Sequence, residues 1–233
     1  MDLSSLDLTN ISKIDDFSGT IPLFPLSTVV LFPNTLLPLH IFEPRYKQMF
    51  NDVINAERMI GMALLKPGWQ SNYYGNPDIF QIVGMGKVVS SETLDDGKLN
   101  IVLYGLRRVK IKEIIEDTPY RLARVDIINN INENGEETHR VRIEELISRW
   151  NFFLDRKEKS HKINVNTNLP LDSLTDSLAT LIYPNVFDRQ KLLEEQNVQK
   201  RAEMIIKELE TRIEVISITT KKRNKILEKR NLN

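Results

Sequence analysis

The pattern of apolar and polar residues changes near the middle of this 233-residue chain. From Ile21 to Ile128, apolar residues come in short runs that are separated by Gly, Pro or Asp-Gly. Such runs with turn residues between them predict β-strands. From about residue 138, apolar residues recur every three or four positions, which predicts helices. The polar run Asn129–Glu137 (NNINENGEE) predicts a boundary between the two parts.

The two ends of the chain differ from its middle. The first 19 residues mix polar and apolar positions without a clear period, and basic residues gather near the C-terminus. These basic residues are Lys221, Lys222, Arg223, Lys225, Lys229 and Arg230. We therefore expect an α+β protein in four parts: a flexible N-terminal arm (1–19), a β-rich domain (20–128), a helical domain (138–220) and a basic C-terminal tail (221–233).

The stretch Ile21–Tyr46 (IPLFPLSTVVLFPNTLLPLHIFEPRY) contains several prolines among Leu, Val and Phe. A proline has no N–H to donate to a sheet, so this stretch cannot be one long strand. We expect short extended pieces at 21–23, 29–32 and 36–39, with sharp turns between them. Pro44 suits the first position of a helix, which the apolar spacing extends to about residue 55.

Further strands are expected at 59–65, 79–90, 100–104, 107–114 and 120–128. Asp96-Gly97 predicts the turn of a hairpin, and Gly105 predicts a bend between two strands. Many short strands with Gly and Pro at their bends indicate a strongly curved sheet or pseudo-barrel.

The helical part is expected to begin with a helix from about 139 to 156. Asp172 is a candidate N-cap for a helix that ends at Ile182, Asp188 for a short helix that ends near 196, and Asn197 for a longer one. The longer helix carries a narrow apolar seam: Ala202, Ile206, Leu209, Ile213 and Ile216. This seam could pair with a second copy of the chain. The β-branched run Ile216–Thr220 predicts that the helix ends or bends there.

Composition narrows the function classes. The 32 basic and 32 acidic residues give a net charge of zero, so no overall field favours nucleic acid or an anionic membrane. The absence of cysteine excludes disulfides, thiolate zinc sites and a Cys nucleophile. No apolar run approaches the ~20 residues that span a bilayer, and no signal-peptide pattern opens the sequence. We expect a cytoplasmic protein without a membrane partner.

Few residues suggest catalysis. His40, His139 and His161 are far apart in the sequence, so we expect no metal site, cofactor or catalytic residue. Glu43 and Arg45 lie at the predicted helix start and are candidates for gripping a peptide, as is His40. A carboxylate at a helix N-terminus is also favourable by itself, so a structural role is the preferred interpretation.

Aromatic residues give further candidates for binding. Trp69, Tyr73 and Tyr74 lie on a predicted loop, where aromatic side chains either recognise a partner or fold inward over the end of the barrel. Phe152 and Phe153 cannot both face the core together with Trp150, so one of them is expected to line a groove between the two domains. For the basic tail, a solvated helix end is preferred over a nucleic-acid patch, since no aromatics are interleaved.

The stretch from Pro22 to Tyr46 resembles the opening of the LON domain, the N-terminal substrate-recognition region of ATP-dependent Lon proteases. The resemblance rests on a string of fixed prolines and aromatics, which is far more specific than a short motif. It continues through four later segments: Gly61–Leu65, Val83–Val89, Asp96–Arg107 and Pro119–Val125.

The resemblance implies a PUA-like β pseudo-barrel with one helix, followed by an α-helical bundle that ends in a long helix. It also implies binding of unfolded or exposed hydrophobic polypeptide segments. The chain contains no Gly-x-x-x-x-Gly-Lys-Ser/Thr phosphate loop, so we expect a stand-alone LON domain without ATPase or protease modules. The expected function is non-enzymatic peptide binding, as an adaptor to a protease or chaperone. The alternative is RNA binding by the barrel and the basic tail.

Overall fold

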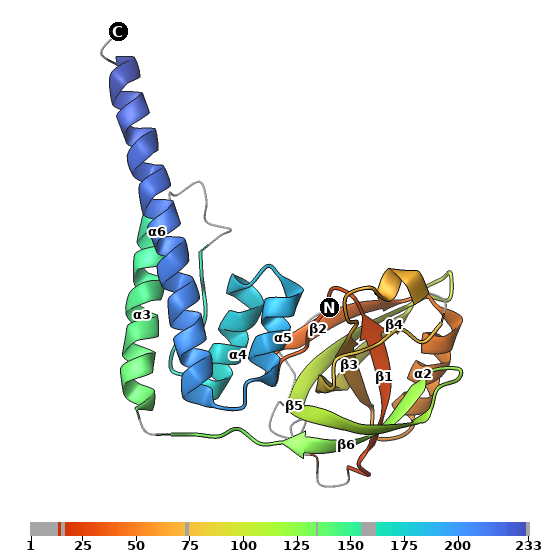
Figure 1. Cartoon of the computed structure of the whole chain (residues 1–233). Coiled ribbons are helices and arrows are strands. Elements are labelled where there is room, and N and C mark those ends of the chain that lie inside the picture. Colours follow the sequence, from red (N-terminus) through yellow and green to blue (C-terminus); the bar gives the residue numbers. More distant parts are fainter. Residues whose placement is uncertain (1–13, 15–16, 73–74, 134, 155–161, 232–233) are drawn as a thin grey trace. The chain divides into compact units, whose positions relative to one another are not determined.

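The computed structural model describes the whole chain except residues 1–13, 15–16, 73–74, 134, 155–161 and 232–233 (Figure 1). From residue 219 to 231 only the backbone of the last helix is described. The chain forms two compact units. The first contains Met1–Asn129 and Asn185–Glu194, and the second contains Asn130–Pro184 and Glu195–Asn233.

The first unit is built on a six-stranded sheet in the order β2-β5-β4-β3-β1-β6. Its strands are β1 (Thr20–Leu26), β2 (Leu36–Ile41), β3 (Met59–Leu64), β4 (Ile82–Thr93), β5 (Leu99–Glu116) and β6 (Arg121–Ile128). All pairs are antiparallel except β1 with β3. Because β5 also pairs with β6, the strands close into a curved ring. This confirms the α+β class, with a ring of strands that is not a regular barrel.

Helix α2 (Pro44–Ile54) begins at Pro44, as the sequence predicts. Its apolar face, which includes Met49 and Phe50, packs on one core cluster with Ile60 and Met62 of β3. Met59 and Ala63, which alternate with these residues along β3, belong to a second cluster. Every side chain of β3 is therefore buried, since both faces of the strand are covered.

Val29–Phe32, which the sequence predicts as a short extended piece, does not form a strand of the sheet. This segment has no ladder pairing and crosses the sheet where two glycines allow a close approach. A Cβ on Gly84 would lie 1.9 Å from the carbonyl oxygen of Leu31, and a Cβ on Gly105 would lie 2.0 Å from that of Phe32. The segment is held by contact with these glycines rather than by a strand ladder.

The two strands predicted on either side of Gly105 form one continuous strand, β5. The register between β4 and β5 shifts between Met85 and Gly86, opposite Gly105, so a bulge absorbs the expected bend. The hairpin at Asp96-Gly97 is confirmed, because Gly97 has a φ of 72° and Leu94 N–H donates to the carbonyl of Lys98.

Helix α5 (Val186–Glu194) belongs to the first unit, although it lies between helices of the second unit in the sequence. The buried Arg108 on β5 donates from Nε to the carbonyl of Leu193 at 3.0 Å. Gln190 Nε2 donates to the carbonyl of Ile82 at 2.9 Å. Each of these side chains therefore links α5 to the strands through a hydrogen bond to a backbone carbonyl.

The second unit contains α3 (Glu136–Phe153), α4 (Leu171–Ile182) and α6 (Val198–Asn231). Helix α6 packs against α3 and α4, and the predicted seam residues Ala202, Leu209 and Ile213 are buried. Pairing of two copies through this seam stays a prediction, and it would require these side chains to leave the core of the unit. The helix continues through Ile216–Thr220, because β-branched residues cost only a few tenths of a kcal/mol each.

The predicted caps are partly correct. Asn197 caps α6, since its Oδ1 accepts from Lys200 N–H at 2.9 Å. Asp172 does not cap α4, because that helix begins after Pro170 and Asp172 lies in its first turn. Asn185, not Asp188, accepts from a backbone N–H at the start of α5. Among the described residues, no helix has an apolar stretch long enough to cross a membrane.

Candidate binding site

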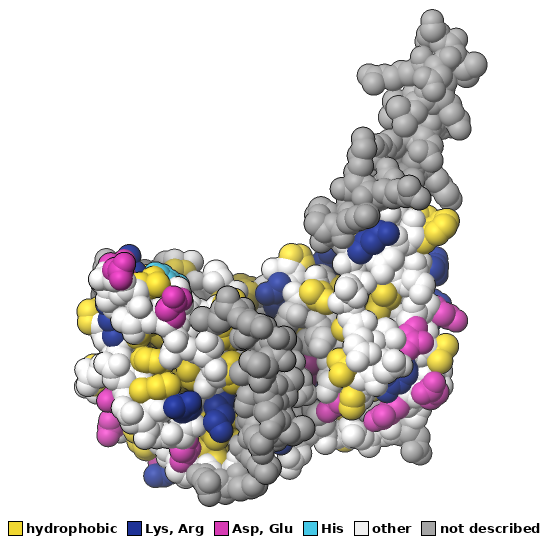
Figure 2. All heavy atoms as spheres, turned by 180° about the vertical axis from the view of Figure 1, so that it is seen from behind, with side chains coloured by type: hydrophobic (Ala, Val, Ile, Leu, Met, Phe, Trp, Pro, Cys, Tyr) yellow, Lys and Arg dark blue, Asp and Glu magenta, His cyan; other side chains and the backbone are white. Residues whose placement is uncertain are grey.

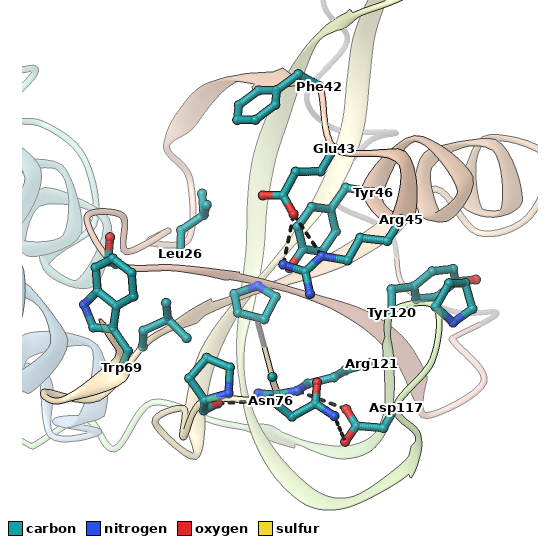
Figure 3. A pocket seen from close by; sticks show the side chains of 16 residues that line it. Leu26, Phe42, Glu43, Arg45, Tyr46, Trp69, Asn76, Asp117, Tyr120 and Arg121 are labelled. Carbon is teal, nitrogen blue, oxygen red and sulfur yellow. Dashed lines mark hydrogen bonds and ion pairs between the residues drawn. The ribbon is translucent and has the colours of Figure 1, made fainter. Parts of the chain in front are cut away.

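A pocket of about 260 Å³ opens in the first unit where β1 and β6 separate (Figure 3). Its walls come from the end of β1, the start of α2, the loop after β3 and the residues just before β6. These segments are far apart in the sequence, and the ring of strands brings them together.

Two prolines explain why the strands separate at this point. The β1–β6 ladder ends where Leu23 pairs with Arg121. Continuing the same register by two residues would place Pro25 opposite Pro119, and neither has an N–H to donate. The ladder therefore cannot continue, and both prolines line the pocket instead.

Aromatic rings form much of the wall. Figure 3 shows Trp69 and Tyr120 on opposite sides of the space, with Phe42 on a third side. Phe42 is 58% exposed, whereas Tyr46 is buried, with its ring 4.3 Å from that of Phe24. Trp69 lies in a short 3-10 helix (Trp69–Asn72) and packs partly on the core. The pocket thus offers apolar surface on a rigid support.

The charged groups of the wall are paired with each other. Glu43 Oε2 accepts from Arg45 Nη2 at 2.9 Å and Nε at 3.0 Å, and the Arg45 guanidinium lies 4.6 Å from the centre of the Tyr46 ring. Arg121 Nε lies 3.1 Å from Asp117 Oδ1. Each cation therefore has an anion beside it, and the wall carries no unbalanced charge.

Polar contacts also hold in place the residues at the lower edge of the pocket in Figure 3. Arg121 Nη2 donates to the carbonyl of Pro77 at 2.8 Å, and Asn76 Nδ2 donates to Asp117 at 2.6 Å. Tyr120 donates its hydroxyl to Asp52 at 2.7 Å. Burial, together with this bond to a carboxylate, raises the pKa of Tyr120 to about 12. The phenol is therefore neutral at physiological pH.

The structure brings three of the predicted binding residues to one place. Trp69, Glu43 and Arg45 all line the pocket. His40 lies elsewhere, on β2, with its Nδ1 2.9 Å from Asn100 Oδ1. That any of these residues binds a ligand stays a prediction.

The other predicted residues are not among those that line this pocket. Phe152, which is 84% exposed, and Phe153 lie on α3 in the second unit, with their rings 5.9 Å apart. Tyr73 and Tyr74 lie outside the described residues, as do the side chains of the basic tail. Where side chains are described, no cluster of three His, Cys, Asp or Glu residues could hold a metal ion.

Sequence reasoning missed several residues of the pocket, notably Pro25, Tyr46, Asp117, Pro119 and Tyr120. The available signal was the Pro119-Tyr120 pair at the start of a predicted strand, since a proline there ends a ladder. Its partner Pro25 could not be identified without the register of β1 against β6.

Charge is mixed on the face shown in Figure 2. Lys and Arg side chains lie among Asp and Glu side chains there, with hydrophobic groups between them. This agrees with the net charge of zero.

Comparison with solved structures identifies the fold. The N-terminal domain of the Lon protease of the Mycobacterium avium complex superposes with a TM-score of 0.63 at 15% identity, covering 82% of this chain and 98% of that one. The Lon N-terminal domain protein from Xanthomonas campestris gives a TM-score of 0.57 at 19% identity, covering 80% and 96%. At these identities the similarity shows the fold alone.

Sequence comparison gives the family. The Lon protease of Cytophaga hutchinsonii is 24% identical over 217 residues, and that of Dictyoglomus thermophilum is 23% identical over 218 residues. The alignments cover 88% and 93% of this chain, which spans only about a quarter of either relative (26% and 27%). Residues 20–211 match the sequence model of the ATP-dependent protease La (LON) substrate-binding domain. The chain therefore belongs to the LON substrate-binding domain family.

Proposed function

We propose that this protein binds polypeptide segments with exposed apolar side chains, without catalysing a reaction on them, and that the pocket between β1 and β6 is the binding site. Membership of a substrate-binding family makes the chain a substrate-recognition module. The observation that supports the site is the aromatic wall with internally paired charges, which favours apolar groups over ions.

We further propose that the protein acts as an adaptor that passes bound segments to a protease or chaperone. Its relatives are Lon proteases, and the matched region is the substrate-binding domain rather than an ATPase or protease part. Exposed aromatic side chains such as Phe42 are typical of sites that contact unfolded chains.

The test is a fluorescence titration with a permanently unfolded protein that contains no tryptophan, such as reduced and alkylated ribonuclease A. In a Trp150→Phe background the signal comes from Trp69, the other of the two tryptophans and a residue of the pocket wall. We expect binding in the micromolar range. Absence of binding at tens of micromolar, or retention of RNA in its place, would overturn the proposal.

Two exposed phenylalanines provide a matched pair of variants. Phe42→Ser removes a ring from the pocket, whereas Phe152→Ser removes a still more exposed ring from α3 of the second unit. We expect Phe42→Ser to weaken binding by about tenfold, or about 1.4 kcal/mol, and Phe152→Ser to change it little. The reverse result would place the binding surface on α3.

A further inference from the structure

The carbonyl of Pro25 is directed to the edge of β1 where the pocket lies. Leu65 N–H donates to the carbonyl of Leu26 at 3.0 Å, so the backbone groups of Leu26 face β3. Successive residues of a strand direct their backbone groups to opposite edges. The carbonyl of Pro25 therefore faces the other edge, into the space that opens beyond the last β1–β6 pair.

This edge can accept a hydrogen bond but cannot donate one. Pro119, at the position that would pair with Pro25, has no N–H, so the ladder supplies no donor to the Pro25 carbonyl. Pro25 itself has no N–H to offer to an incoming chain. A segment that lies along this edge can therefore form one backbone bond here, from its own N–H to the carbonyl of Pro25.

The size and charge of the pocket restrict the side chain that can enter. Its volume of about 260 Å³ lies just below the range of about 300–1,000 Å³ for small-molecule sites, so it suits one large side chain rather than a whole small molecule. The guanidinium groups of Arg45 and Arg121 are already paired with Glu43 and Asp117. An entering charge would lose water without gaining an unpaired opposite charge, which is unfavourable.

Building on the function proposed above, we propose that the pocket binds an extended segment through one uncharged aromatic or large aliphatic side chain and one backbone N–H, which donates to the carbonyl of Pro25. The ring of Trp69 and the ring of Phe42 contact the side chain. The bound segment adds to β1 as a short strand in the place that β6 leaves open.

The experiment uses the full chain and capped seven-residue peptides of Gly and Ser with one central guest residue. Binding is followed by the NMR shifts of the Ser27 amide and the Trp69 indole, because both residues line the pocket. We expect Phe and Leu guests to shift both signals, and Glu, Lys or Ala guests to bind at least tenfold more weakly. In a second series, each backbone nitrogen of the Phe peptide is methylated in turn. Methylation of one nitrogen should weaken binding at least tenfold, and methylation of the others less than threefold.

The outcomes separate this inference from the proposed function. Equal binding of all the methylated peptides would overturn the backbone bond to Pro25, while the Phe peptide and the unfolded protein still bind. Equal binding of the Glu or Lys guests would overturn the preference for an uncharged side chain. If the unfolded protein binds but no peptide shifts the Ser27 and Trp69 signals, the inference is wrong, and the Phe42→Ser and Phe152→Ser pair decides the proposed site independently.

Discussion

Arg201 and Asp176 form an ion pair in the core of the second unit, with Nε and Oδ1 3.6 Å apart and side chains that are 0% and 2% exposed. Arg201 Nη1 also donates to Asn130 and to the carbonyl of Glu195. Asn130 and Glu195 are the residues at which the chain enters this unit from the first unit. The buried Arg201 side chain therefore forms hydrogen bonds at both points where the chain enters this unit.

Replacing Arg201 should destabilise the second unit strongly. Arg201→Met removes the cation that lies beside the buried Asp176 carboxylate, which costs about 3–5 kcal/mol. The loss can be measured by urea unfolding in a Trp69→Phe background, where the remaining tryptophan, Trp150, reports on this unit. Arg212→Met is the control, because its pair with Glu208 is partly exposed and should be worth at most about 1 kcal/mol. Similar losses of stability in both variants would contradict the structural role of the Arg201–Asp176 pair.

Substitution of Gly84 should destabilise the first unit. The Cβ of Gly84→Ala would collide with a backbone carbonyl at 1.9 Å, and the segment that carries Leu31 must move away. We expect a loss of about 3 kcal/mol, at the upper end for overpacking. Unfolding in a Trp150→Phe background, followed by Trp69 fluorescence, measures this loss of stability. In Gly86→Ala the nearest atom to the Cβ is the end of the flexible Leu31 side chain, at 2.6 Å, and the nearest backbone atom, the carbonyl oxygen of Tyr104, is 3.1 Å away, so about 1 kcal/mol is expected. A smaller loss at residue 84 than at residue 86 would refute this explanation.

Loss of Arg108 should loosen α5 from the strands. Arg108→Met removes the hydrogen bond to the carbonyl of Leu193 and the contact of the guanidinium with the Phe32 ring, 5.8 Å away. We expect the amides of α5 to exchange with deuterium at least tenfold faster, while those of β3 stay protected. Arg107→Met serves as the control, since Arg107 donates to the carbonyl of the adjacent Leu106. Unchanged deuterium exchange in α5 would show that contacts other than Arg108 hold α5 on the strands, and would contradict this prediction.

Tyr120 should titrate near pH 12. An exposed tyrosine has a pKa of about 10, and burial with the bond to Asp52 raises that of Tyr120 to about 12. The neutral phenol therefore stabilises the fold fully below pH 10, and this contribution is lost as the pH rises through 12. The tyrosinate absorbance of the wild type minus that of Tyr120→Phe gives the curve, with circular dichroism confirming that the protein is folded. Asp52→Asn should lower the midpoint, and a wild-type midpoint near 10 would disprove the assignment.

Much of the secondary structure follows from short-range rules that a sequence displays directly. Pro44 begins α2, Asp96-Gly97 turns a hairpin, and Asn197 caps α6, because each depends on the backbone preferences of a few neighbouring residues. The same rules failed at Val29–Phe32, where a strand-like composition occurs in a segment without ladder partners.

For the candidate site, the sequence identified Trp69, Glu43 and Arg45 as separate residues, from the placement of aromatic and charged side chains near a loop and a helix start. It did not place them around one pocket. It also suggested Phe152 and Phe153, which lie on the other unit. The exposure of an aromatic residue can be predicted from the residues next to it in the sequence. Its distance from a segment far away in the sequence cannot.

The sequence by itself determined most of the strands and helices, and which family the chain resembles, because these depend on local spacing and on the positions of prolines. Only the tertiary structure decided that α5 packs with the strands and that the β1–β6 ladder would next place Pro25 opposite Pro119. Both results depend on the register and packing of distant segments, which many long-range contacts set together. The pocket exists because the β1–β6 ladder stops where its next hydrogen-bonded pair would consist of two prolines from distant parts of the chain, neither of which can donate a hydrogen bond.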